Sequence, residues 1–200
     1  MSILPYPDRL TAFARRIGRT LLPGSCLLCG TDSPDDLLCL DCRADLPSLP
    51  SARCPLCADQ TTHGERCGAC LKDPPHFDRT IAAFTYDFPL DRIVHALKYG
   101  HQLAVANWCA QQLAPRVDSA ALDCIIPLPL HPERLRQRGF NQSGEIAKRL
   151  ARASGLPIAH NSLLRMRATT AQADLPHKER RNNVRGAFEC RTDFSGKRLL

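Results

Sequence analysis

Four C-x2-C pairs in the N-terminal part of the chain constrain its fold more than any other feature of the sequence. The first two pairs follow the pattern C-x2-C-x9-C-x2-C, and the same pattern starts again 28 residues later. The eight residues are Cys26, Cys29, Cys39, Cys42, Cys54, Cys57, Cys67 and Cys70. Two residues between cysteines let both sulfurs of a pair turn toward one point, and two pairs complete a tetrahedral zinc site. The spacing therefore predicts two closed structural zinc sites, which make this part of the chain a scaffold and not a reaction centre.

Two other uses of paired cysteines fit the rest of the sequence less well. A disulfide framework requires an oxidising compartment, but arginines interrupt the apolar residues of the N-terminus, which therefore lacks the core of a signal peptide. Redox chemistry at a C-x2-C pair does not explain four tandem copies. Because reduced thiols are required, we expect a cytoplasmic location. Which pairs share a metal stays open: sequential pairing is the simplest arrangement, and a cross-brace between the first and third pairs is the alternative.

The chain is expected to divide into three segments. Residues 1–22 carry apolar side chains at helical spacing and predict an amphipathic helix. Residues 23–75 contain the cysteine pairs but too few large apolar side chains for a core, so metal ligation must supply the folding energy. Each structural zinc can provide on the order of 10 kcal/mol or more. The proline-rich break at Lys72–His76 marks the start of a second domain, residues 76–200. No apolar run is long enough to span a membrane.

The second domain alternates between strand and helix patterns. Strands are expected at 79–86, 124–130, 158, 163–166 and 187–190, and helices at 91–99, 103–113 and 142–153, with a helical turn at 177–183. This alternation predicts a parallel α/β sheet, with Trp108 packed inward. Residues 196–200 look like a glycine turn followed by the start of a new central strand. The three solitary cysteines, Cys109, Cys124 and Cys190, are expected to be small core side chains.

The net charge of +7 is unevenly distributed. Residues 1–78 contain 8 Lys and Arg against 10 Asp and Glu, whereas residues 79–200 contain 19 against 10. The excess lies entirely after His131, where 15 basic residues face 6 acidic ones. Because zinc-bound thiolates offset part of the total, the overall charge is a weak argument for nucleic-acid binding. What remains is a local basic field after His131, which suits a polyphosphate ligand or a nucleic-acid backbone.

The basic residues are densest in Pro127–Gln142, PLPLHPERLRQRGFNQ. Here a buried strand is expected to end in a loop where three arginines crowd before Gly139, and guanidinium groups bind phosphate oxygens in pairs. Gly139 allows a close approach of backbone N–H groups, and the helix that starts near Gln142 directs its positive end the same way. Ligands gather at the carboxyl ends of strands in open α/β sheets, so this loop is a candidate anion site. An exposed, merely solvated basic turn is the alternative that the charges leave open.

Three segments of the second domain resemble the ComF family, whose competence-associated members carry a phosphoribosyltransferase-like domain, often after a double zinc ribbon. They are Leu90–Gln102 (LDRIVHALKYGHQ), Ile125–Gln142 (IIPLPLHPERLRQRGFNQ) and Arg165–Phe188 (RMRATTAQADLPHKERRNNVRGAF). The resemblance runs from about Cys26 to the end of the chain and includes the cysteine pairs. It implies a type I phosphoribosyltransferase fold with a Rossmann-like parallel sheet, a phosphoribosyl pyrophosphate ligand with Mg²⁺, and an association with DNA uptake and competence proteins.

The resemblance also assigns residues to the ligand. The segment Pro129–Asn141 would face the pyrophosphate, and the segment Thr169–Phe188, here called the flap, would be a mobile cover over the site. The candidate phosphate-binding residues are Lys98, Arg134, Arg138, Gly139, Asn141, Gln142, Gln172, Arg181 and Asn183. Such an enzyme displaces pyrophosphate from the anomeric carbon with little acid–base work by side chains, so no catalytic residue is assigned. The acceptor substrate stays open.

The phosphoribosyl pyrophosphate motif of this fold is missing from the 200 residues. The motif is an apolar strand that ends in two acidic residues and a Thr/Gly-rich turn, and the turn cradles the 5′-phosphate. By family order it should begin directly after Leu200. We therefore expect a C-terminally truncated domain that lacks the final strand and helix, is poorly stable and performs no transferase turnover.

Two binding functions compete with the enzyme-type hypothesis. The zinc ribbons and the basic C-terminal half are also suited to gripping single-stranded nucleic acid. Aromatic residues that could stack on bases are sparse there, since only Phe140, Phe188 and Phe194 accompany the late basic region. A zinc-held protein-interaction module is the other alternative.

Overall fold

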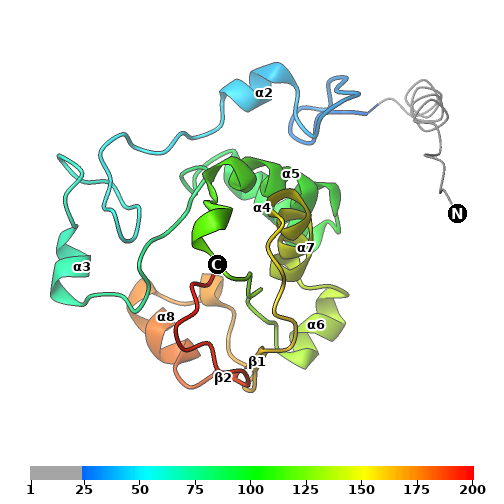
Figure 1. The fold of residues 1–200 in the computed structure, drawn as a ribbon. Coiled ribbons are helices and arrows are strands. Elements are labelled where there is room, and N and C mark those ends of the chain that lie inside the picture. Colours follow the sequence, from blue (N-terminus) through cyan, green and yellow to red (C-terminus); the bar gives the residue numbers. More distant parts are fainter. Residues whose placement is uncertain (1–23) are drawn as a thin grey trace, which may run out of the picture.

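The computed structural model describes residues 24–200, and the helix predicted for residues 1–22 lies outside them. Two cysteine-rich loops precede a helical body with a small sheet (Figure 1). The helices are α2 (Leu40–Ala44), α3 (Gly68–Lys72), α4 (Leu90–Tyr99), α5 (Ala104–Leu113), α6 (Pro132–Arg138), α7 (Gln142–Ser154) and α8 (His177–Val184). The strands are β1 (Leu163–Arg165) and β2 (Phe188–Cys190), and the 3₁₀ turns are η1 (Ala114–Arg116), η2 (Ser119–Ala121) and η3 (Gln172–Asp174). None of the described helices combines the length and apolar character that a membrane span requires.

The two cysteine-rich loops repeat one backbone design at the 28-residue interval of the sequence. In the first loop Cys26 N–H donates to the Thr31 carbonyl over 2.7 Å, and in the second Cys54 N–H donates to the Asp59 carbonyl over the same distance. Single antiparallel bridges close both loops at equivalent positions, Ser25–Asp32 and Arg53–Gln60. Each loop then ends in a five-residue helix, α2 or α3. We call these loops the first ribbon (residues 24–45) and the second ribbon (residues 52–73).

Only the first ribbon is built into the hydrophobic core. Leu38 is 1 % exposed and, together with Cys26, belongs to the cluster that contains Ile93 of α4 and Trp108 of α5. The second ribbon has Arg66 at the position of Leu38 and contributes no residue to either core cluster of the described chain. Burial of apolar side chains therefore fixes the first ribbon to the helical body, whereas the second ribbon stands apart from the core.

The helical body forms where the sequence predicted it. The expected helices 91–99, 103–113 and 142–153 are present as α4, α5 and α7. Trp108 is 3 % exposed and stacks on Phe84 with ring centroids 5.6 Å apart, which confirms its inward packing. Helix α7 begins because the Asn141 side chain accepts a hydrogen bond from Ser143 N–H, and it ends at Gly155 in the left-handed conformation, φ 75°. The helical turn expected at 177–183 is α8.

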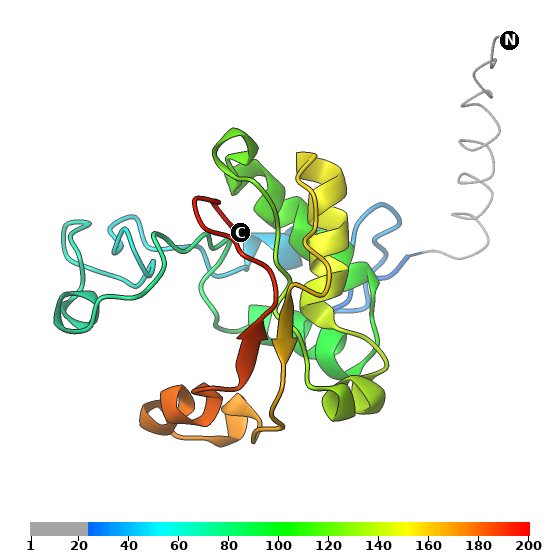
Figure 2. The same ribbon diagram turned by 60° about the horizontal axis from the view of Figure 1, so that its bottom comes forward.

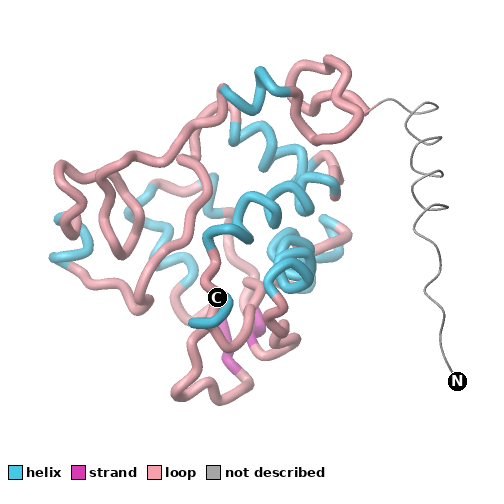
Figure 3. Tube along the Cα trace, turned by 45° about the horizontal axis from the view of Figure 1, so that its top comes forward, coloured by secondary structure: helices cyan, strands magenta, loops and turns pink. Residues whose placement is uncertain are grey.

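The strand predicted at 79–86 is wrong. No strand forms there, and most of the N-terminal part of the described chain is irregular (Figure 3). Its backbone instead pairs with loops, because Thr80 N–H donates to the Leu56 carbonyl over 2.7 Å and Thr85 N–H to the Pro47 carbonyl over 3.1 Å. The β-branched and aromatic side chains of this segment thus lie against irregular backbone, where no regular ladder can form.

The sheet is smaller than the predicted parallel sheet, and the described fold is a mixed α/β arrangement. Strands β1 and β2 pair antiparallel, with Leu164 opposite Glu189 (Figure 2). Parallel pairing occurs at single bridges, Ile125 with Ile158 on one side and Cys124 with Leu199 on the other. The start of a strand after Gly196 is thereby confirmed, because Leu200 N–H donates to the Cys124 carbonyl over 3.0 Å. Prolines at 127 and 129 remove N–H donors directly after this pairing, which explains why the ladder stays short.

Candidate functional site

Each ribbon gathers four cysteine sulfurs at one point. The sulfurs of Cys26, Cys29, Cys39 and Cys42 lie within 4.8 Å of one another, and so do those of Cys54, Cys57, Cys67 and Cys70. The first four and the last four cysteines therefore form separate clusters, and this is the sequential pairing. The Sγ atoms of Cys29 and Cys39 are 3.7 Å apart, and those of Cys57 and Cys67 are 3.6 Å apart. A tetrahedron with Zn–S bonds of about 2.3 Å has sulfurs about 3.8 Å apart, so both clusters fit a structural zinc ion.

The thiols of each cluster are electrostatically unequal. Backbone N–H groups of Cys57 and Cys67 hydrogen-bond to Cys54 and lower its pKa to about 6. The pKa of the equivalent Cys26 also falls to about 6, although burial opposes the shift. Burial and hydrogen bonds with the neighbouring thiols raise the pKa of Cys70 to about 12. Cys26 and Cys54 are thus ready to be thiolates, and a divalent cation would stabilise negative charge on a sulfur such as that of Cys70.

The solitary cysteines take no part in these clusters. Burial raises the pKa of Cys109 to about 11, so its thiol is unreactive at neutral pH, as expected of a core residue. The core position predicted for Cys190 is wrong, because this side chain is exposed and its Sγ donates to the Thr192 carbonyl over 3.2 Å. Its place on β2 explains the difference, since the Glu189–Cys190 end of that strand is exposed.

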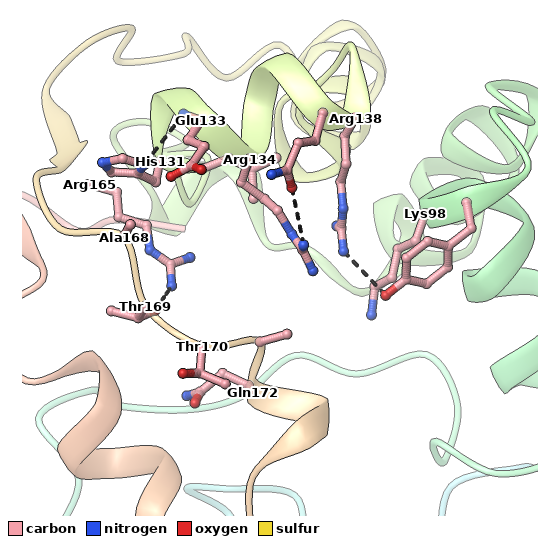
Figure 4. A pocket seen from close by; sticks show the side chains of 14 residues that line it. Lys98, His131, Glu133, Arg134, Arg138, Arg165, Ala168, Thr169, Thr170 and Gln172 are labelled. Carbon is pink, nitrogen blue, oxygen red and sulfur yellow. Dashed lines mark hydrogen bonds between the residues drawn. The ribbon is translucent and has the colours of Figure 1, made fainter.

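A cavity of about 350 Å³ lies in the second half of the chain, between α4, α6, the end of β1 and the start of the flap (Figure 4). Its lining residues are Lys98, Tyr99, Leu130, His131, Glu133, Arg134, Gln137, Arg138, Arg165, Ala168, Thr169, Thr170, Ala171 and Gln172. Lysine and arginine side chains come from three separate elements, and Glu133 is the one carboxylate of this lining. The cavity therefore has a strongly positive field that suits an anionic ligand.

Helix α6 supplies the first wall of the cavity, and the loop predicted there from the sequence is wrong. Pro132 occupies the first turn, where a missing N–H costs nothing, and Gly139 ends the helix at φ 73°. A helix places residues four apart on the same face, so Arg134 and Arg138 both line the cavity (Figure 4). Arg136 lies between them in sequence but is exposed and absent from the lining.

Arg138 is held at the back of this wall by two neighbours, Tyr99 and Gln142. It donates to the Tyr99 hydroxyl over 3.4 Å and to Gln142 Oε1 over 3.2 Å, and its guanidinium carbon lies 5.1 Å from the centre of the Tyr99 ring. Its Nε is buried and has no hydrogen-bond partner among the described residues. Lys98, in the last turn of α4, reaches the same side of the cavity (Figure 4).

Arg165 faces this wall from the other side of the cavity (Figure 4). It is the last residue of β1, donates to the Thr169 hydroxyl, and lies 5.5 Å from the centre of the Phe188 ring on β2. Its Nε is likewise buried without a partner in the described chain. Neither Arg165 nor Tyr99 was predicted as a site residue from the sequence, although both lie within segments that resemble the ComF family. The sequence did contain an indication of Arg165. This basic residue lies near the end of the strand predicted at 163–166, and the end of a strand is expected at the same edge of the sheet as the loop after 124–130.

The nine predicted phosphate-binding residues fall into two groups. Lys98, Arg134, Arg138 and Gln172 line the cavity, whereas Gly139, Asn141, Gln142, Arg181 and Asn183 do not. Gly139 N–H donates to the Leu135 carbonyl over 2.8 Å, so it closes α6. Asn141 caps α7 and also donates to the Leu128 carbonyl over 3.0 Å, which fixes the turn between α6 and α7.

The other three residues outside the lining also hold the cavity's surroundings in place. Gln142 is 8 % exposed and lies behind Arg138. Asn183 Nδ2 lies 2.9 Å from both the Thr170 carbonyl and Gln172 Oε1, and so joins α8 to the cavity wall. Arg181 forms an ion pair with Asp73 at the end of the second ribbon.

Comparison with known proteins gives matches in both halves of the chain. Residues 17–71 match the Double zinc ribbon domain family. Competence protein F of Haemophilus influenzae is 30 % identical over 159 residues, which cover 76 % of this chain and 69 % of that protein. DNA utilization protein YhgH of Salmonella typhimurium is 30 % identical over 191 residues, covering 90 % and 83 %, and Competence protein ComFC of Bacillus subtilis is 25 % identical over 134 residues, covering 62 % and 56 %. The search of solved structures returned no match.

Proposed function

The chain belongs to the ComF family, and from this premise we propose that residues 76–200 are a phosphoribosyltransferase-like module that binds a phosphoribosyl pyrophosphate-type ligand in DNA uptake or utilization. One observation carries the proposal: Lys98, Arg134, Arg138 and Arg165 converge from separate elements on one cavity. Relatives named for competence and DNA utilization support the cellular role. The two ribbons, residues 24–45 and 52–73, supply the zinc-bound scaffold.

The charges of the cavity favour a ligand with more than one phosphate. Four cations around about 350 Å³ repel one another when the cavity holds only water, and a diphosphate would neutralise them. Guanidinium groups on opposite sides can each bind two phosphate oxygens, and Lys98 adds a point charge. A diphosphate offers phosphate oxygens to both sides of the cavity, where Arg134 and Arg165 lie (Figure 4).

The cavity itself does not fit a protein-held Mg²⁺ ion. Magnesium requires oxygen ligands in octahedral geometry, and this lining offers one carboxylate, Glu133, among four cations. We propose that any Mg²⁺ arrives bound to the phosphate oxygens of the ligand. The side chains of this chain would bind and orient the phosphates and perform no proton transfer.

We further propose that these 200 residues bind the phosphate end of the ligand without transferase turnover. The sequence contains no acidic pair followed by a Thr/Gly-rich turn, which in the resembled fold holds the ribose hydroxyls and the 5′-phosphate. Without those contacts the sugar's anomeric carbon is not positioned for attack, and positioning is the main contribution of such a site. Binding and turnover are therefore separate tests for this chain.

Calorimetric titration of the zinc-loaded chain with phosphoribosyl pyrophosphate and Mg²⁺ tests the binding. Arg134→Gln and Arg165→Gln are expected to weaken binding about ten-fold each, because each removes a charge-assisted hydrogen bond to phosphate. Arg136→Gln is the matched control, since this residue is exposed on the other face of α6. Absence of binding, or an equal loss with Arg136→Gln, would contradict the proposal.

A second candidate function is single-stranded nucleic-acid binding. Tyr99 favours it, because this residue is 52 % exposed at the edge of the cationic cavity and could stack on a base. A fluorescent oligonucleotide titrated at several salt concentrations would separate the two functions. Strong binding with a steep salt slope that the phosphoribosyl ligand does not compete for supports nucleic-acid binding. Absence of both kinds of binding would favour the protein-interaction module.

A further inference from the structure

The flap is held in place by polar contacts and not by burial. Of the flap residues whose exposure is described, only Ala187, next to β2, is buried. The cavity wall at Thr170 and Gln172 is instead tied to α8 by hydrogen bonds from Asn183, each 2.9 Å long, and by Gln172 Nε2, which donates to the Arg180 carbonyl over 3.1 Å. Segments with little apolar burial open at low free-energy cost, so each contact contributes noticeably to the position of the flap.

A further polar contact to the flap comes from the second ribbon. Arg181 on α8 forms an ion pair with Asp73, although the two residues are 108 positions apart in sequence. Asp73 ends α3, where its N–H donates to the Ala69 carbonyl over 3.0 Å, and α3 also carries the cluster residue Cys70. The chain that leaves α3 runs toward α8 (Figure 1). The same five-residue helix thus carries a metal-cluster cysteine and ends at the anchor of the flap.

We propose that the second ribbon controls the flap: the Asp73–Arg181 ion pair holds α8, and through Asn183 it holds the cavity wall in the position that binds phosphate. The inference rests on the proposed phosphate binding in the cavity. It gives the two ribbons different tasks, since the first is fixed in the core and the second contacts the flap. Disruption of the second cluster would unfold α3, displace Asp73 and loosen the flap, whereas the first ribbon has no such connection among the described contacts.

The internal repeat provides a matched control. Asp45 is the residue of the first ribbon that corresponds to Asp73, because it ends α2 and its N–H donates to the Asp41 carbonyl over 3.1 Å. Like Asp73, it is exposed. Its side chain forms no ion pair with the flap in the described structure. Asp45→Asn therefore removes the same charge from the same type of helix end without touching α8.

Hydrogen exchange of the ligand-free, zinc-loaded chain measures directly how firmly the second ribbon holds the flap. Asp73→Asn and Arg181→Gln are expected to accelerate amide exchange across residues 169–184 by about two- to five-fold, as the loss of an exposed ion pair implies. The double variant should exchange no faster than either single variant, because both changes break the same pair. Asp45→Asn should leave exchange in the flap unchanged, and equal acceleration by Asp45→Asn would overturn the proposal. Zinc content is measured in every variant to show that both clusters remain loaded.

Titration with inorganic pyrophosphate links the flap to the cavity. Its dissociation constant should rise by a similar factor with Asp73→Asn and stay unchanged with Asp45→Asn. One outcome is that pyrophosphate fails to bind the unmodified chain while Asp73→Asn still accelerates amide exchange in the flap. In that case the proposed phosphate binding is wrong, and the proposal that the second ribbon holds the flap stands. If pyrophosphate binds all variants equally and amide exchange in the flap is unchanged, the second ribbon does not hold the flap, and the proposed phosphate binding stands.

Discussion

At one left-handed backbone position of the repeat the two ribbons carry different residue types, and the effect on stability can be measured. Gly30 and Ala58 occupy the same place in the repeat and both have positive φ, 78° and 63°. Glycine adopts this left-handed conformation freely, whereas a Cβ atom crowds the backbone there. The second ribbon therefore carries local strain that the first ribbon avoids.

Exchange of the residue types should shift the stability of the ribbons in opposite directions. Ala58→Gly is expected to stabilise the zinc-loaded second ribbon by about 0.5–1 kcal/mol, and Gly30→Ala to destabilise the first by about 1 kcal/mol. No atom lies within 4 Å of a Cβ added at Gly30, so the effect is one of backbone conformation alone. Zinc-competition titration with a chelator would check both changes. Lower zinc affinity with Ala58→Gly would contradict the expectation.

Helix α7 is the element that holds the core and the cavity together, and its first turn is sensitive to pH. Hydrogen bonds from Lys148 and Arg149, 2.7 and 2.8 Å long, lower the pKa of Glu145 despite partial burial. A carboxyl group whose pKa is lower in the folded state stabilises the protein fully at pH values above its ordinary pKa of 4.5. This stabilisation is lost as the pH falls through the lower pKa of the folded state. The negative charge also lies near the positive end of the helix, which adds to this effect.

The pH dependence of unfolding should therefore change when Glu145 is replaced. Glu145→Gln is expected to reduce the free energy of unfolding by about 1 kcal/mol at neutral pH and by less at about pH 3. Urea denaturation at both pH values checks this. Acid release of zinc is common to both proteins, so the difference between them isolates Glu145. A constant difference at all pH values would show that its charge is not responsible.

At the scale of the whole molecule, the ribbons differ in how they are attached. Cys26 is 3 % exposed and packs with the helices, while Cys54 is equally buried but lies within its own loop. Loss of the first zinc thus removes part of the core, and loss of the second leaves the core intact. Among the described ion pairs, the one that reaches the flap from a ribbon comes from the second ribbon, Asp73 with Arg181.

Removal of one ligand from each cluster tests this attachment. Cys26→Ser is expected to lower the thermal midpoint of the helical body by several degrees, because about 1–3 kcal/mol of packing is lost with the ribbon. Cys54→Ser should release one zinc ion with little change in that midpoint. Near-ultraviolet circular dichroism of Trp108, which lies in the core beside the first ribbon, reports on this core and not on the second ribbon. Equal midpoints for the two variants would contradict this assignment.

Short-range patterns in the sequence were sufficient for the local structure. Cysteine spacing predicted both clusters, and apolar periodicity predicted α4, α5 and α7, because ligand spacing and helical spacing act over a few residues. The helix α6 also had local signals, Pro132 at its start and Gly139 at its end, but the density of arginines suggested a loop. The expected strand at 79–86 failed since a strand requires a regular partner, and its neighbours there are ribbon loops.

The cavity and the roles of the ribbons were decided only by tertiary structure. Tyr99 meets Arg138 across 39 positions, and Asp73 meets Arg181 across 108. Such contacts depend on how helices and loops pack, and no pattern along the chain specifies them. The sequence by itself therefore determined the zinc clusters, the main helices and the basic character of the second half. Packing determined which cations share one cavity and which ribbon lies free of the core, because both follow from distances in space and not from spacing in sequence.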